Sequence, residues 1–195
     1  MRVALSFDAE FPDRPSPGDS EGLILAALDE ARMRATFFLQ GRWARAYPAV
    51  ARSIAEAGHL IGNHSHHHAP MDGLRDDYFR EDVRDAEEWI QRSTGADPRP
   101  RFRCPFGSGM EDARVLGLLE ELGYRHVGWD VDPRDWEEGR TRSELCERVL
   151  GGVEARESSI VLMHGWPAVT AQTLPELIAE LRSAGAEFTT VDELV

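Results

Sequence analysis

A histidine-rich stretch carries the strongest chemical signal in this sequence, because residues 62–68 read Gly-Asn-His-Ser-His-His-His. His64 and His68 are four residues apart, so on a helical turn their imidazoles would share a face and could hold one metal ion. Imidazole together with carboxylate suits zinc, and a catalytic zinc site keeps an open position for water. Taken alone, a polar histidine-rich surface loop is an equally good interpretation, because histidine tracts also bind metals adventitiously.

Two acids at the end of the first apolar run are candidates for a metal ligand and a base. Asp8 and Glu10 follow Val3–Phe7 and are two residues apart, so an extended backbone would direct both side chains to the same side. One carboxylate could bind the metal while the other serves as a base. Taken alone, solvated acids at a strand end are the plainer interpretation.

Three more stretches place polar or aromatic residues after apolar runs. Arg103 can pair with a carboxylate and lower its pKa. The proline and glycine around Phe106 predict a tight turn whose backbone N–H could face an oxyanion. Residues 129–136 (WDVDPRDW) place two tryptophans around three aspartates, and aromatic walls bind sugar rings or cap small pockets. His164 follows an apolar run and could be a general acid if a carboxylate orients it.

Apolar runs alternate with helix-like segments along the whole chain. We expect strands at Val3–Phe7, Ala35–Leu39, His59–Ile61, Phe102–Cys104, Tyr124–Trp129, Ile160–Met163 and Glu187–Val191. We expect helices at Ser20–Arg32, from Pro48 to a stop at Gly58, and at Asp77–Ser93, Glu111–Leu122, Ser143–Val153 and Leu174–Ala184. This alternation predicts an α/β fold of parallel strands with helical crossovers, either a barrel or a doubly wound sheet.

The placement of the polar residues favours the barrel. They fall just after the expected strands, and in a barrel those strand ends open on one face and can converge on one site. In an open sheet only the strand ends at a switch point would meet. The length of 195 residues fits a single domain, 1–195, without linker or repeat.

Composition limits the classes of partner. The formal charge is −13, with 35 acidic and 22 basic residues, and such a surface repels nucleic acid and anionic membrane. No apolar run reaches the roughly 18 residues of a membrane helix, and the start of the chain lacks the pattern of a secretory signal. We therefore expect a cytoplasmic protein. Cys104 and Cys146 suggest neither a disulfide framework nor a cysteine metal site.

Together these stretches resemble the polysaccharide deacetylase catalytic domain (NodB homology, carbohydrate esterase family 4) over nearly the whole chain. The segments ATFFLQG, IAEAGHLIGNHSHHH, FRCPFG, WDVDPRDW and IVLMHG look like the motifs of that family and occur in its order. The resemblance implies a distorted (β/α)7-type TIM-like barrel, with its site at the carboxyl ends of the strands.

The resemblance also implies roles for individual residues. His64 and His68 match the metal-binding histidines, and Arg103 matches the arginine that pairs with the catalytic aspartate. His164 matches the catalytic histidine, and Asp135 matches the aspartate that tunes it. Trp136 and Leu162 match residues that line the acetyl-methyl pocket. Phe106 stands where a tyrosine is usual, and its backbone N–H would serve the oxyanion.

One position departs from the family pattern of two adjacent aspartates, a base and then a metal ligand. Asp8 matches the base, but Ala9 occupies the second position and Glu10 is the nearest replacement. We expect Asp8 as base and Glu10 as ligand. The two roles could be exchanged, or histidines and water alone could bind the metal.

The implied activity is metal-dependent hydrolysis of an N-acetyl group, or less readily an O-acetyl group. The expected metal is a divalent cation, zinc first, and the expected substrate is an acetylated amino sugar, oligosaccharide or related small molecule. One alternative is a metal-independent amidohydrolase on the same fold that opens a cyclic imide or ureide. Another is a non-catalytic carbohydrate-binding relative.

Overall fold

The computed structural model describes residues 1–13 and 19–195, and these fold into two compact units. Unit 1 contains Met1–Asp8, Trp129–Val195 and the described residues of Arg14–Thr36. Unit 2 contains Ala9–Asp13 and Phe37–Gly128. Each unit is therefore assembled from separate stretches of the chain.

Unit 1 is built on three parallel strands. β1 (Arg2–Ala9, of which Ala9 belongs to unit 2) pairs with β6 (Ser158–His164) and with β7 (Glu187–Thr189). The β1–β6 register runs from Arg2 opposite Ser158 to Asp8 opposite His164. Two strand ends that carry candidate catalytic residues thus lie at the same level.

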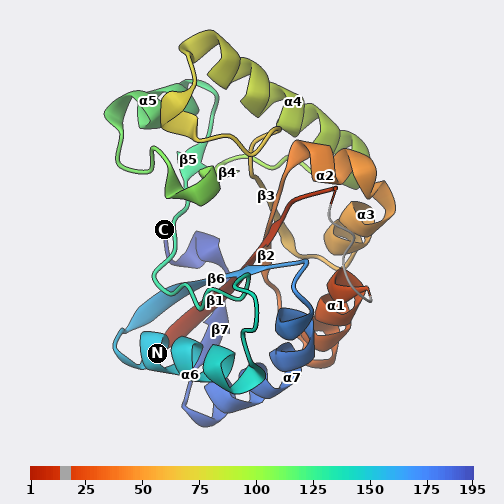
Figure 1. The fold of residues 1–195 in the computed structure, drawn as a ribbon, viewed down its shortest axis with the longest axis vertical. Coiled ribbons are helices and arrows are strands. Elements are labelled where there is room, and N and C mark those ends of the chain that lie inside the picture. The colour runs from red at the N-terminus through yellow and green to blue at the C-terminus, as the bar shows by residue number, and fades with distance from the viewer. Residues whose placement is uncertain (14–18) are drawn as a thin grey trace. The chain divides into compact units, whose positions relative to one another are not determined.

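The helices of unit 1 are α1 (Ser20–Glu30), α6 (Arg142–Glu154) and α7 (Ala168–Ser183), followed by a 3₁₀ turn at Val191–Glu193. Figure 1 shows that α7 packs beside both α1 and α6. A capping box starts α6, because the Thr141 hydroxyl and the Glu144 carboxylate satisfy each other's backbone N–H groups.

Unit 2 has the strand order β5-β4-β3-β2. These strands are β2 (Thr36–Leu39, of which Thr36 belongs to unit 1), β3 (Leu60–Asn63), β4 (Arg101–Phe102) and β5 (Arg125–His126). The helices are α2 (Gly41–Ala46), α3 (Pro48–Glu56), α4 (Asp76–Thr94) and α5 (Ala113–Glu121), with 3₁₀ turns at Met71–Gly73 and Pro105–Gly107. In Figure 1, α2 and α3 lie against the long helix α4.

The core of unit 2 forms where α4 and α5 cover the strands. Its buried side chains include Met71, Phe79, Val83, Phe102, Cys104, Val115, Leu118, Leu119 and Tyr124. On α4 the buried stripe has the three-and-four spacing of an amphipathic helix, as the sequence predicts. One buried member of that stripe, Asp82, is charged.

The expected elements are confirmed in order and type. The differences are at their ends: β5 is reduced to two residues, and α7 begins at Ala168, six residues before the expected start. Helix α2 was not expected, because six residues are too short to display a period. Among the described residues, no helix combines the length and the apolar character that crossing a membrane requires.

Candidate functional site

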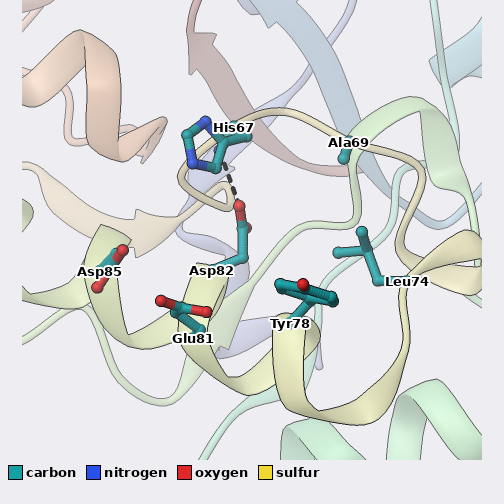
Figure 2. Close-up of a pocket in the computed structure, with 7 residues that line it drawn as sticks. All are labelled: His67, Ala69, Leu74, Tyr78, Glu81, Asp82 and Asp85. Atoms are coloured by element: carbon teal, nitrogen blue, oxygen red, sulfur yellow. Dashed lines mark hydrogen bonds between the residues drawn. The ribbon is translucent and has the colours of Figure 1, made fainter.

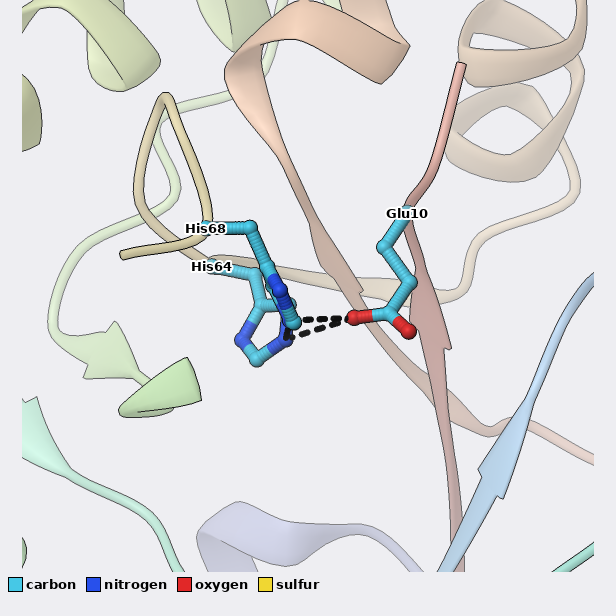
Figure 3. Close-up of side chains that lie close together, drawn as sticks. All are labelled: Glu10, His64 and His68. Carbon is cyan, nitrogen blue, oxygen red and sulfur yellow. Dashed lines mark hydrogen bonds and ion pairs between the residues drawn. The ribbon is translucent and has the colours of Figure 1, made fainter. Parts of the chain in front are cut away.

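Three predicted metal ligands lie together in unit 2. Glu10, directly after β1, meets His64 and His68, which follow β3, and their ligand atoms all lie within 4.8 Å of one another (Figure 3). The His64 Nε2 atom is 3.3 Å from Glu10 Oε2 and 3.1 Å from His68 Nε2. His68 Nε2 also contacts the same carboxylate oxygen. All three side chains are almost fully buried.

This donor set fits a divalent cation. His64 Nδ1 donates to the carbonyl of Arg103 at 2.9 Å, which leaves Nε2 as the unprotonated nitrogen, as a metal ligand requires. Ligands at about 2.0–2.1 Å from a tetrahedral zinc lie about 3.3 Å from one another. The distances from His64 Nε2 to Glu10 Oε2 and to His68 Nε2, 3.3 and 3.1 Å, match this separation between two ligands of one zinc ion. Two imidazole nitrogens and one carboxylate also leave a fourth position open.

The loop of residues 64–68 is not the helical turn that we considered from the sequence. Ser65 and His68 have φ values of 60° and 58°, in the left-handed region that non-glycine residues avoid. Side chains hold this conformation: Asn63 Oδ1 accepts from the Ser65 N–H and Ser65 Oγ from the His68 N–H, both at 2.9 Å. The histidines therefore converge through a tight loop and not through helical periodicity.

Aromatic rings enclose His68. The ring of Phe11 lies 5.0 Å from the imidazole of His68, and the ring of Phe106 lies 4.4 Å from it, both edge to face. The expected tight turn is confirmed, since Phe106 has a φ of 59° inside the 3₁₀ turn Pro105–Gly107. The service of its backbone N–H to an oxyanion stays a prediction.

Arg103 is fully buried in unit 2. Its Nε donates to the carbonyl of Val127 at 3.2 Å and its Nη2 to that of Gly128 at 3.0 Å, and its guanidinium lies 4.0 Å from the centre of the Phe38 ring. These contacts fix the orientation of the guanidinium. Its pairing with Asp8, which the family resemblance implies, stays a prediction.

A second group of predicted residues meets in unit 1. Asp135 accepts from His164 Nδ1 and from the His164 backbone N–H, both at 2.7 Å. Asp8 lies opposite His164 on the neighbouring strand, and its carbonyl accepts from the Gly165 N–H at 2.9 Å. The imidazole is thus held by its Nδ1, which leaves Nε2 for proton transfer.

Two residues of unit 1 that we expected to line a substrate pocket differ in exposure. Leu162 lies in β6 and is buried, whereas Trp136 is 48% exposed. Sequence reasoning missed Thr170 in the first turn of α7, whose hydroxyl donates to Asp135 at 2.6 Å. It also missed Phe11 and Asp82. Only Asp82 had a sequence signal, a charge within an apolar stripe.

His126 gives a prediction about pH. Burial lowers its pKa to about 4, and the positive charge of Arg103 acts in the same direction. Because the usual value is about 6.5, the unfolded chain binds more protons than the folded one between pH 6.5 and 4. In the metal-free protein this residue should therefore lower the stability as the pH falls through that window. We expect its imidazole to titrate near 4 by NMR and the variant His126→Gln to lose less stability on acidification; titration near 6.5 would contradict this.

The sequence matches the family model described as "Polysaccharide deacetylase" over residues 1–127. A peptidoglycan-N-acetylglucosamine deacetylase of Bacillus cereus is 32% identical over 98% of this chain and 67% of its own length. A chitooligosaccharide deacetylase of Azorhizobium caulinodans is 32% identical over 79% of this chain and 70% of its own length. The chain thus spans about two thirds of the length of these relatives.

Solved structures agree with these matches. A CE4 family pseudoenzyme from Bacillus anthracis matches with a TM-score of 0.88 and 27% identity, over 99% of this chain and 64% of that one. A peptidoglycan N-acetylglucosamine deacetylase in complex with an N-hydroxybenzamide compound matches with a TM-score of 0.86 and 30% identity, over 98% of this chain and 86% of that one. The expected distorted (β/α) barrel is thereby confirmed. With its family model, its relatives and its fold in agreement, the chain belongs to the polysaccharide deacetylase family.

Proposed function

We propose that this protein hydrolyses the N-acetyl group of an acetylated amino sugar or short oligosaccharide with the help of a divalent metal, most favourably zinc. The observation that carries the proposal is the convergence of Glu10, His64 and His68, with the Nδ1 atom of His64 engaged by a backbone carbonyl. The relatives named as a peptidoglycan-N-acetylglucosamine deacetylase and a chitooligosaccharide deacetylase support the choice of substrate class.

In this proposal Glu10, His64 and His68 hold the cation. When bound, such a cation polarises a carbonyl group and lowers the pKa of water. Zinc suits the site because it accepts two imidazoles and one carboxylate and leaves a position open. The burial of the three side chains keeps competing solvent away from them.

Asp8 takes the role of the base that accepts a proton from the attacking water. Asp8 and Glu10 are separated by one residue, so their Cα atoms are at most about 7 Å apart by the geometry of the chain alone. The family resemblance implies that Arg103 pairs with this base, and the Phe106 N–H would donate to the developing oxyanion.

His164 takes the role of the acid that protonates the leaving amine. Asp135 holds its Nδ1 at 2.7 Å, and a negative charge at that distance favours the protonated imidazole. A base and an acid kept in opposite protonation states by their neighbours are the usual arrangement for hydrolysis near neutral pH. Trp136 and Leu162 would form the wall against the acetyl methyl group.

A non-catalytic role is the second candidate, because Ala9 replaces an acid of the family pattern and a structural relative is described as a pseudoenzyme. The presence of Asp8 and His164 argues against it, since a sugar-binding protein needs neither a base nor an acid. A mutant of that relative is described as having restored enzymatic activity, so the fold itself supports both outcomes.

Metal removal combined with an assay for acetate tests the proposal. The protein is stripped with a chelator, reloaded with one equivalent of zinc and assayed on N-acetylglucosamine oligomers, a muropeptide and an O-acetylated xylooligosaccharide. We expect release of acetate from the N-acetylated substrates only after reloading. Undiminished release of acetate by the stripped protein would refute the metal dependence, and zinc binding without any release would favour the non-catalytic relative.

A further inference from the structure

The loop that carries His64 and His68 has a strained backbone that is held only in part by its own side chains. Two of its five residues, Ser65 and His68, have left-handed φ values, and each such non-glycine conformation costs on the order of 1 kcal/mol or more. The two ligands are separated by three residues, so any relaxation of this backbone would change the distance between their Nε2 atoms. The support must act on the residues between the ligands.

Asp82 of α4 gives this support. Its Oδ2 accepts from the backbone N–H of His66 at 2.8 Å, and its Oδ1 accepts from the backbone N–H of His67 at 2.9 Å. Figure 2 shows the carboxylate rising from the helix toward His67. Hydrogen bonds to an ionised acceptor are about twice as strong as neutral ones, and two at once fix an orientation as well as a distance.

The burial of Asp82 indicates that the contact is specific. The residue is 6% exposed and lies in the buried stripe of α4 beside the apolar side chains of Phe79, Val83 and Ala86. A charged group in that position is costly unless it is hydrogen-bonded. Here both of its oxygens are used, and both serve the same short stretch of backbone.

We propose that Asp82 is a positioning residue that sets the metal affinity of the protein by holding the backbone between His64 and His68. This inference rests on the proposed metal site but goes beyond it, because Asp82 contacts neither of the ligand imidazoles in the contacts above. It predicts that affinity depends on the position of both carboxylate oxygens and not on the negative charge alone.

The neighbouring Asp85 provides a matched control. Asp82 and Asp85 line the same pocket of about 300 Å³ with Glu81, Tyr78 and His67, so both place a negative charge beside the loop (Figure 2). Only Asp82 carries the pair of hydrogen bonds to the backbone of the loop. A purely electrostatic contribution would be reproduced by removing the charge at position 85.

The experiment measures the zinc affinity of the intact protein by competition with a chromophoric chelator, without substrate. We expect Asp82→Asn, which can accept through one oxygen only, to raise the Kd for zinc about 10- to 100-fold, as removal of groups that orient ligands does elsewhere. Asp82→Glu keeps the charge but displaces the carboxylate, and its Kd should rise as well. Asp85→Asn should stay within about twofold of the original protein.

The outcomes separate this inference from the proposed function. Zinc affinity unchanged in both Asp82 variants, or lowered equally in Asp82→Asn and Asp85→Asn, would overturn the positioning role. Failure of the unsubstituted protein to bind zinc would instead overturn the proposed function. If Asp82→Asn does not fold, judged by circular dichroism, then Asp82→Glu decides the matter. Faster amide exchange at His66 and His67 in the metal-free Asp82→Glu protein is the expected supporting result.

Discussion

Replacing His64 or His68 with alanine is expected to abolish both zinc uptake and the release of acetate. The Nε2 atoms of these histidines are 3.1 Å apart and contact the same oxygen of Glu10, so each substitution removes a third of the donor set. Loss of groups that only orient ligands costs about 10- to 100-fold in affinity, and loss of a ligand should exceed that. Chelator competition and elemental analysis measure the first effect, and acetate release measures the second.

The same measurement assigns the two acids near the end of β1. Glu10→Gln should weaken zinc binding, whereas Asp8→Asn should leave zinc bound. The reverse pattern would show that the roles are exchanged, and no change in either variant would leave histidines and water as the ligands.

His67→Ala is the matched control in the histidine tract. Its imidazole packs against that of His66 and lies outside the group of three ligands. The backbone N–H that Asp82 binds is retained in this variant. We expect zinc affinity and turnover within about twofold of the original protein. If His67→Ala lost zinc as completely as His64→Ala, the tract would be a general metal-binding stretch and the defined site would be refuted.

Asp8→Asn and His164→Gln are expected to lower kcat by about 10²- to 10⁴-fold, the usual contribution of general acids and bases, while zinc stays bound. The carboxamide that replaces the Asp8 carboxylate could not accept the proton of water, and the carboxamide that replaces the His164 imidazole could not supply one to an amine. Steady-state kinetics over a range of pH check this. In the variant His164→Gln the fall of kcat at high pH, the alkaline limb of the pH profile, should also disappear, because that fall reports deprotonation of the acid.

A milder variant tests the support of His164. Thr170→Val removes one of the hydrogen bonds to Asp135 but leaves both bonds between Asp135 and His164. We expect a loss of about tenfold or less in kcat with a shifted alkaline limb. Full activity in the variant His164→Gln would remove the histidine from the mechanism and leave Asp8 and the metal site as the catalytic elements.

The local sequence determined the order and type of the secondary structure. The apolar run at Val3–Phe7 and the amphipathic period at Asp77–Ser93 were sufficient to predict β1 and α4, because burial of one face leaves a period in the sequence. The short helix α2 was missed since its six residues show less than two turns. The ends of β5 and α7 shifted because pairing partners and packing, which are remote in sequence, set where an element stops.

The sequence by itself also determined which side chains could do chemistry: the pair His64 and His68, the acids Asp8 and Glu10, and His164. The type of a residue limits which atoms can donate, accept or bind a metal, and the pattern of apolar runs predicts where the strands end. Only the tertiary structure decided that His64 and His68 meet Glu10 through a left-handed loop. It also decided that Asp82 binds the backbone of this loop and that Thr170 donates to Asp135. Those contacts join residues 15 to 58 positions apart in the sequence, and contacts over such separations depend on the path of the whole chain, which no local pattern predicts.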